Sequence, residues 1–221
     1  MQSSSFIPYT RPTYDADEML ERAKSHYEWM NQRRTLREFS DRPVSKEVIE
    51  QLILTASTAP SGAHKQPWTF CAISNPEMKK KIREAAEEEE YTNYHGRMSD
   101  TWLKDLEPFE TDWHKPFLET VPWLIVVFRR IYELDEEGAK QNNYYVNESV
   151  GLACGMLLEA IHYAGLVALT HTPSPMNFLT KLLDRPANER PYLLIPVGYP
   201  ASDAKVPDLE RKSLSDISVF Y

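Results

Sequence analysis

A helical segment from about residue 142 to residue 164 is apolar nearly all round. Its apolar positions cover most of the helix circumference: Val146, Val150, Leu152, Ala153, Met156, Leu157, Leu158, Ala160 and Ile161. A helix of this kind is expected to be buried nearly all round. Gly151 and Gly155, four residues apart, leave one thin face where a further helix can approach closely.

The segments around this helix predict an α+β domain with a mixed central sheet flanked by helices. Further helices are expected over residues 15–33, from Ser45 onward, from Asn75 towards Tyr94 and over 177–183, and strands over 68–73, 121–129, 166–169 and 192–197. Residues 96–120 are aromatic and interrupted by prolines, which favours an irregular functional lid. We expect one domain over residues 1–221, with a helical arm (1–30), a lid (90–118) and a C-terminal tail (201–221).

Composition excludes several classes of function. The net charge of the 221 residues is −8, and no long basic block is present, so we expect no nucleic-acid partner. No apolar stretch approaches the roughly 20 residues that cross a bilayer, and the N-terminus carries no targeting pattern, so we expect a cytoplasmic chain without membrane contact. The six histidines form no ligand spacing, and we expect no metal. Cys71 and Cys154 indicate a reduced compartment.

An arginine cluster follows the first predicted helix. Arg33, Arg34 and Arg37 carry fork-shaped guanidinium groups, and Thr35 adds a hydroxyl. Such groups grip a phosphate bidentately, and the chain has no glycine-rich nucleotide loop to do so instead. The alternative is a solvated basic helix end that favours the helix dipole.

Two turns carry small or hydroxylated residues. Gly62 would let a flat ligand approach the backbone, and Ser61 could hydrogen-bond that ligand. Thr170, His171 and Thr172 follow a predicted strand, where hydroxyl groups often face a ligand. An ordinary turn explains either segment equally well.

A third set of polar residues suits a zwitterion. Glu90 and Tyr94 lie four residues apart on one predicted helix, and Lys115 lies in the predicted lid. A carboxylate and an ammonium group at a fixed separation would bind the two charges of an amino acid. The alternative is that residues 87–90 form a solvated, charged helix face.

Together these motifs resemble the FMN-dependent nitroreductase superfamily. The motifs are RRTLR (33–37), APSGAH (59–64), QPWTF (66–70), PVGYP (196–200) and Arg211-Lys212. Four features are similar to the branch of that family that dehalogenates halotyrosines. They are the SGAH motif (61–64), the helix that ends near Tyr94, the residue Lys115, and the VPDL motif (206–209). The resemblance covers about residues 30–215, with several motifs in the same order.

The resemblance implies a nitroreductase-like fold and an intertwined homodimer, with FMN at the interface and in contact with both subunits. The cofactor-binding residues that it implies are Arg33, Arg34, Thr35, Leu36, Arg37, Ser61, Gly62, Thr170, His171, Thr172 and Arg211. The arginines would hold the phosphate and ribitol end. Thr172 would donate to the flavin N5, which favours single-electron steps over hydride transfer. Family members often have a small hydroxyl residue at the position of His171.

The resemblance also implies the reaction, which is reductive dehalogenation of a halotyrosine, ArI + 2e⁻ + H⁺ → ArH + I⁻, and converts 3-iodotyrosine to tyrosine and iodide. The N–H of Ala63 would meet the phenolate oxygen of the substrate. Glu90, Tyr94 and Lys115 would hold its amino-acid end and draw residues 90–118 over it as a substrate lid. Thr172 and Ala63 are the expected catalytic residues, and reduced flavin would deliver its electrons one at a time.

Other functions stay open. A general nitroreductase or quinone reductase that uses NAD(P)H would not need the zwitterion contacts. A non-catalytic flavin or aromatic amino-acid binding protein would keep the arginines, and an adaptor would bind no ligand. The chain has no dinucleotide fingerprint, so NADP would enter the flavin site itself or act through a separate reductase as external electron donor. Animal members of the dehalogenating branch carry an N-terminal membrane anchor, which this sequence does not show.

Overall fold

A computed structural model describes residues 6–221, so the first five residues of the predicted arm lie outside the described part. The chain divides into two compact units, Met1–Arg33 and Arg34–Tyr221. In the first unit, α1 (Ala16–Asn31) begins after Asp15, whose carboxylate accepts the N–H of Glu18 at 2.9 Å. This carboxylate caps the helix by satisfying a backbone donor of its first turn. The helix predicted over residues 15–33 is therefore present.

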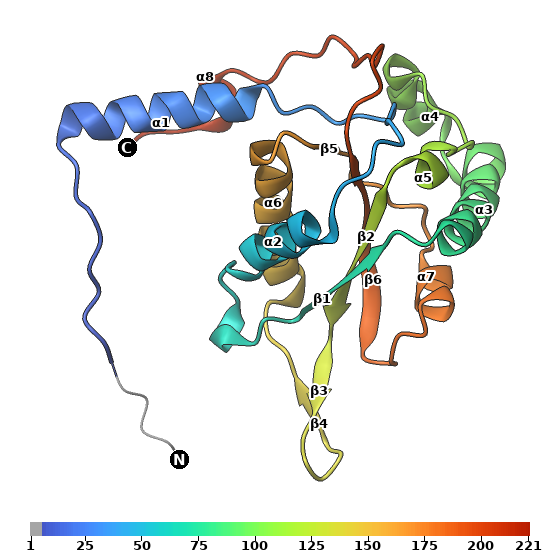
Figure 1. Cartoon of the computed structure of the whole chain (residues 1–221), viewed down its shortest axis with the longest axis horizontal. Helices are drawn as coiled ribbons and strands as arrows, with labels where there is room; N and C mark the ends of the chain where they lie inside the picture. The colour runs from blue at the N-terminus through green and yellow to red at the C-terminus, as the bar shows by residue number, and fades with distance from the viewer. Residues whose placement is uncertain (1–5) are drawn as a thin grey trace. The chain divides into compact units, whose positions relative to one another are not determined.

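The second unit is built on an antiparallel sheet with the strand order β1-β2-β6-β5 (Figure 1). The strands are β1 (Trp68–Ile73), β2 (Trp123–Arg130), β5 (Val167–Ala168) and β6 (Glu189–Gly198). All four predicted strands are present, and the α+β class is confirmed. The mixed character of the sheet is limited, within residues 6–221, to one parallel bridge between Thr35 and Ala168.

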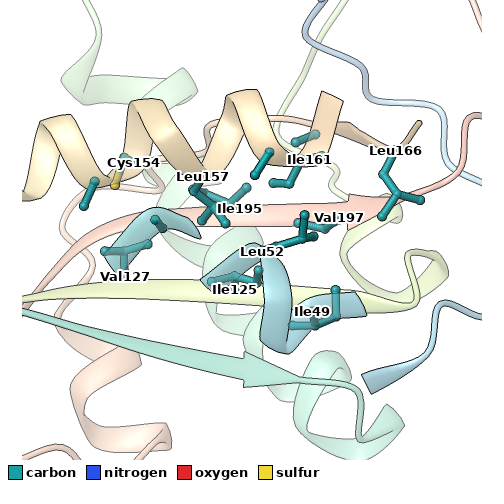
Figure 2. Packing of buried hydrophobic residues seen from close by; sticks show 14 of the residues in the cluster. Ile49, Leu52, Ile125, Val127, Cys154, Leu157, Ile161, Leu166, Ile195 and Val197 are labelled. Carbon is teal, nitrogen blue, oxygen red and sulfur yellow. The ribbon is translucent and has the colours of Figure 1, made fainter. Parts of the chain in front are cut away.

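Helices cover both faces of this sheet (Figure 1). One face packs against α2 (Lys46–Ser57) and α6 (Val146–Tyr163), and the other against α3 (Pro76–Thr92), α5 (Phe117–Thr120) and α7 (Asn177–Leu182). Side chains of β2 alternate between the two cores, which is why this strand is a continuous apolar run. Figure 2 shows Ile125 and Val127 of β2 beneath Leu157 of α6.

The expectation that α6 is buried nearly all round is met only in part within the single chain. Leu152 is 52% exposed, and Tyr163 is exposed as well. A Cβ atom added to Gly155 would meet nothing within 4 Å, whereas one added to Gly151 would lie 3.2 Å from the Tyr192 hydroxyl. Part of the apolar surface of α6 is therefore left uncovered by the rest of its own chain.

The prediction of an irregular segment over residues 96–120 is also wrong. The chain leaves α3 through a π-helix, η2 (Asn93–Arg97), and continues in α4 (Asp100–Leu106) and the 3₁₀ helix η3 (Glu107–Phe109). Ser99 caps α4 by accepting the N–H of Trp102 at 3.2 Å. These helices are too short to produce a recognisable period in the sequence.

The remaining elements are short. A hairpin of β3 (Tyr132–Leu134) and β4 (Lys140–Asn142), the 3₁₀ helix η1 (Gly62–His64) and α8 (Leu214–Ile217) were not predicted. Across residues 6–221, no helix is both long and apolar enough to span a bilayer. The same residues contain no group of three His, Cys, Asp or Glu side chains placed to hold a metal ion.

A buried histidine anchors the segment that follows β5. The N–H of His171 donates to Leu194 at 2.8 Å, and the N–H of Leu194 donates back to His171 at 3.0 Å. The imidazole is 8% exposed, packs edge-on against Phe117 at 5.9 Å, and buries an Nε2 that lacks a hydrogen-bond partner within the described chain. Burial, and then the positive charges of Lys115 and Arg37, lower the pKa of His171 to about 3.

This histidine is expected to destabilise the fold in mild acid. Below about pH 6.5 the unfolded chain binds a proton on the imidazole, whereas the folded chain does not until about pH 3. Stability is therefore lost as the pH falls through this window. Urea unfolding of the wild type and of His171→Asn at about pH 7 and about pH 4.5 checks this. The wild type should lose about 2–3 kcal/mol more than the variant, and an equal loss in both proteins would contradict it.

Candidate functional site

A cavity of about 210 Å³ lies where the lid segment, α3 and the segment after β5 come together. It is lined by seven of the residues predicted from the sequence: Arg37, Glu90, Tyr94, Lys115, Thr170, His171 and Thr172. The sequence placed these residues in three separate clusters. The fold unites them because the end of α3 and the loop before α5 both pack beside the end of the sheet.

Two opposite charges are buried in this cavity without forming an ion pair. Glu90 is 6% exposed, and within residues 6–221 its carboxylate has no hydrogen-bond or ion-pair partner. Lys115 is 4% exposed, and its ammonium group donates to Thr111 Oγ1 at 3.2 Å and to the carbonyl oxygen of Asp112. Burial raises the pKa of Glu90 and lowers the pKa of Lys115, and their attraction for each other only partly opposes these shifts. A ligand carrying both charges would compensate both groups.

Two further polar groups complete this wall of the cavity. The Tyr94 hydroxyl donates to the carbonyl oxygen of Thr111 at 3.2 Å, and its ring centroid lies 5.5 Å from the Lys115 ammonium. Burial and the nearby Glu90 raise the pKa of Tyr94, so the phenol stays protonated at neutral pH. The guanidinium of Arg37 lies 5.6 Å from the centroid of Phe109, and burial lowers the pKa of Arg37.

The segment after β5 presents its hydroxyl groups to the cavity. Thr170 and Thr172 are exposed, whereas Leu169 and His171 are buried. This alternation is that of an extended strand, and the bridge between His171 and Leu194 holds the segment in that conformation. The two hydroxyls therefore face the same side at one end of the sheet.

The arginine segment runs beside the same end of the sheet. The N–H of Leu36 donates to Ala168 at 3.2 Å, and Leu36 is buried. The guanidinium of Arg34 donates to the carbonyl oxygen of Pro207, so the C-terminal tail docks here. Arg33 belongs to the N-terminal unit and Arg211 to the tail. The roles of these two arginines at the site stay predictions.

Ser61, Gly62 and Ala63 are not brought to this cavity. The N–H of Gly62 lies 3.4 Å from the hydroxyl of Ser149, in the first turn of α6. Thr170 follows the far end of the same helix, and 14 residues of helix at about 1.5 Å each correspond to roughly 21 Å. The two halves of the predicted site therefore lie at opposite ends of α6 (Figure 1).

The Ser61–Ala63 turn has a strained backbone. Ala63, His64 and Gln66 have φ values of 49°, 56° and 47°, in the left-handed region that L residues rarely adopt. A Cβ atom on Gly62 would lie 2.9 Å from the carbonyl oxygen of Tyr144, so this position needs glycine. Strain of this kind is typical of binding and catalytic sites.

Sequence reasoning missed several residues of the site. Thr111, Phe109 and Phe117 supply hydrogen bonds and ring contacts to the polar wall, and Tyr144 packs on the Gly62 turn. The aromatic content of residues 96–120 indicated that the segment containing Thr111, Phe109 and Phe117 is functional, but it did not single out these three residues. No pattern pointed to Tyr144, because the contact joins residues 82 positions apart in the chain.

Several proteins with known names are similar to this chain over most of its length. Iodotyrosine deiodinase of Haliscomenobacter hydrossis is 61% identical over 220 residues, which span 100% of this chain and 99% of the relative. Human iodotyrosine deiodinase 1 is 46% identical over 214 residues, 96% of this chain and 74% of the relative. A crystal structure of oxidized iodotyrosine deiodinase bound to FMN and 3-iodo-L-tyrosine superposes with a TM-score of 0.75 and 30% identity, covering 88% of this chain and 100% of that one.

The family model named Nitroreductase family matches residues 30–199, which is most of the chain. The matched range contains the whole sheet, α2 to α7 and every residue that lines the cavity. The chain belongs to the nitroreductase family.

Proposed function

We propose that this protein is an FMN-dependent reductive dehalogenase that converts 3-iodotyrosine to tyrosine and iodide. The observation that carries the proposal is the cavity in which a buried Glu90 carboxylate, without a partner among residues 6–221, and a buried Lys115 ammonium lie beside exposed threonine hydroxyls. Relatives that span nearly the full chain are named iodotyrosine deiodinase, and a structural neighbour contains FMN and 3-iodotyrosine. A general nitroreductase has no need for a binding site with two opposite charges.

The residues around the cavity fit FMN. The Arg37 guanidinium supplies a positive charge for the flavin, and the Thr170 and Thr172 hydroxyls are exposed at the end of the sheet. We propose that Arg34, Thr35 and Leu36 continue this cofactor site, with Arg33 and Arg211 at the phosphate and Thr172 donating to N5. Bound FMN supplies the two electrons of the reaction, one at a time.

The protein side chains bind and orient the amino-acid end of the substrate. Glu90 accepts from the ammonium group, and Lys115 donates to the carboxylate. Tyr94, which stays protonated, contributes a neutral hydroxyl. Closure of the helical lid segment over the substrate excludes water, which strengthens each of these interactions.

We further propose that two copies of the chain complete each site. The Ser61–Ala63 turn and the threonine segment lie at opposite ends of α6, so one chain does not assemble them into one site. A second copy would supply its own turn, with the Ala63 N–H at the substrate phenolate oxygen. The exposed Leu152 and the open surface at Gly155 support this arrangement, because they give α6 an uncovered apolar face.

Electrons would come from an external donor, NADPH or a separate reductase. The cytoplasmic location expected from the sequence stays a prediction. A nitroreductase or quinone reductase remains the second candidate, because solved structures described as nitroreductases share the fold at about one-fifth sequence identity, for example with a TM-score of 0.62.

The dehalogenase function predicts stoichiometric turnover. The FMN-loaded protein is reduced anaerobically with dithionite and then mixed with 3-iodotyrosine. We expect reoxidation of the flavin spectrum together with tyrosine and iodide in equal amounts, measured by chromatography. Reoxidation by nitroaromatics but not by 3-iodotyrosine would favour the nitroreductase alternative instead.

The buried carboxylate predicts a loss of affinity confined to the amino-acid end. Glu90→Gln should weaken 3-iodotyrosine binding by at least about tenfold, because a neutral amide replaces a charge-assisted acceptor. Binding of 2-iodophenol, which has no amino-acid end, should not change. Both dissociation constants can be measured from quenching of flavin fluorescence. Glu88→Gln, at an exposed position on the same helix, is the matched control.

The dimer predicts that a charge on the uncovered face of α6 prevents assembly. Leu152→Arg should sediment as a monomer and retain little FMN, because a buried unpaired charge costs several kcal/mol. Leu152→Met conserves the apolar contact and should remain a dimer. If Leu152→Arg sediments as the wild type does, this face of α6 is not the interface.

A further inference from the structure

The loop that carries Lys115 is tied to α3 by a side chain outside the cavity. The backbone N–H of Lys115 donates to Oε1 of Glu87 at 2.7 Å, and the Glu87 side chain is only 12% exposed. Carboxylates that accept a backbone N–H form hydrogen bonds about twice as strong as neutral ones. Glu87 thus holds the main chain of the residue whose ammonium group faces the cavity.

Glu87 lies on the same face of α3 as Glu90, which lines the cavity. Glu90 follows Glu87 by three residues, which is the spacing of neighbours on one helix face, and Tyr94 lies four residues further on, in η2. A bond from Glu87 to Lys115 therefore fixes the lysine against the helix that also carries the opposite charge. The separation between the Glu90 carboxylate and the Lys115 ammonium depends on this bond.

A basic side chain holds Glu87 in place from one turn earlier. Arg83 Nη1 lies 2.7 Å from Glu87 Oε2, and Arg83 Nε donates to the carboxylate of Glu119. Lys79, a further turn back, donates to the carbonyl oxygens of Glu119 at 2.8 Å and Val121 at 2.7 Å. Three successive turns of α3 thus tie down residues 115–121.

These ties differ in what they hold. Lys79 and Arg83 hold Glu119 of α5 and Val121, which follows α5. Glu87 alone of the three contacts Lys115 itself. Loss of the Lys79 contacts would loosen packing, whereas loss of the Glu87 bond, or of the Arg83 ion pair that orients Glu87, would let the ammonium group change its distance from Glu90.

We propose that Glu87 is a positioning residue that sets the spacing of the two charges which bind the amino-acid end of the substrate. It touches neither substrate nor cofactor and acts through the main chain of Lys115. The inference rests on the proposed function, because it assumes that Glu90 and Lys115 bind a zwitterion. Glu87 thereby contributes to the selectivity for amino-acid substrates over simple halophenols.

The test compares two ligands on the FMN-loaded, oxidised protein. Dissociation constants for 3-iodotyrosine and 2-iodophenol are measured by quenching of flavin fluorescence for the wild type, Glu87→Met, Glu87→Gln and Glu88→Met. Methionine and glutamine have similar length and helix propensity, but only glutamine keeps an oxygen that accepts the Lys115 N–H. Glu88→Met makes the same change at the neighbouring exposed position.

We expect Glu87→Met to weaken 3-iodotyrosine binding by about tenfold and to leave 2-iodophenol binding within about twofold of the wild type. Glu87→Gln should recover most of the affinity, and Glu88→Met should behave as the wild type. An unchanged ratio between the two ligands in Glu87→Met overturns the inference, whether both affinities stay the same or both fall. A purely structural role would weaken both ligands together.

A second variant covers the case in which Glu87→Met does not fold with FMN. Arg83→Gln keeps Glu87 but removes the ion pair that orients it, and should weaken 3-iodotyrosine alone by about threefold. Equal effects on both ligands would again overturn the inference. The Glu90→Gln variant distinguishes failure of the zwitterion site from failure of the role of Glu87. If Glu90→Gln leaves the affinity for 3-iodotyrosine unchanged, Glu90 does not bind the amino-acid end and the zwitterion site is refuted. If Glu90→Gln lowers this affinity but Glu87→Met does not, only the positioning role of Glu87 is refuted.

Discussion

The cost of burying two opposite charges apart from each other governs the organisation of this protein. Within residues 6–221, neither the Glu90 carboxylate nor the Lys115 ammonium forms an ion pair, although both are almost inaccessible to solvent. Desolvation of this kind destabilises the folded chain and persists only where the surrounding structure enforces it. Here α3 carries one charge, the loop before α5 carries the other, and side chains of α3 hold that loop.

The sheet positions the threonine side of the cavity. Both of its faces are covered by helices, and β2 is hydrogen-bonded on either side by β1 and β6. The segment after β5 is then fixed by a single bridge between His171 and Leu194. Its threonines thus present their hydroxyls from the end of the sheet, on the opposite side of the cavity from Glu90 of α3 and Lys115.

Sequence reasoning was strongest where periodicity or residue chemistry is local. The strand over residues 68–73 is found at the predicted positions, and the cavity unites Glu90, Tyr94 and Lys115 as the residue types suggested. It failed for α4, whose seven residues, about two helical turns, leave no recognisable period. It also missed Glu87, because a run of four glutamates gives no indication of which carboxylate meets a backbone N–H 28 residues away. Contacts of that range depend on tertiary packing.

Two separate sets of hydrogen bonds hold Lys115, one at its main chain and one at its ammonium group. Its main chain is fixed to α3 through Glu87, while its ammonium group donates to Thr111 and Asp112 of the lid segment. An ammonium group has three hydrogens, so one donor remains for a ligand while the lid contacts persist. Ligand affinity and the order of residues 111–112 are therefore thermodynamically linked. The ratio of the ligand's affinities for the ordered and the disordered segment equals the factor by which bound ligand shifts the segment towards order.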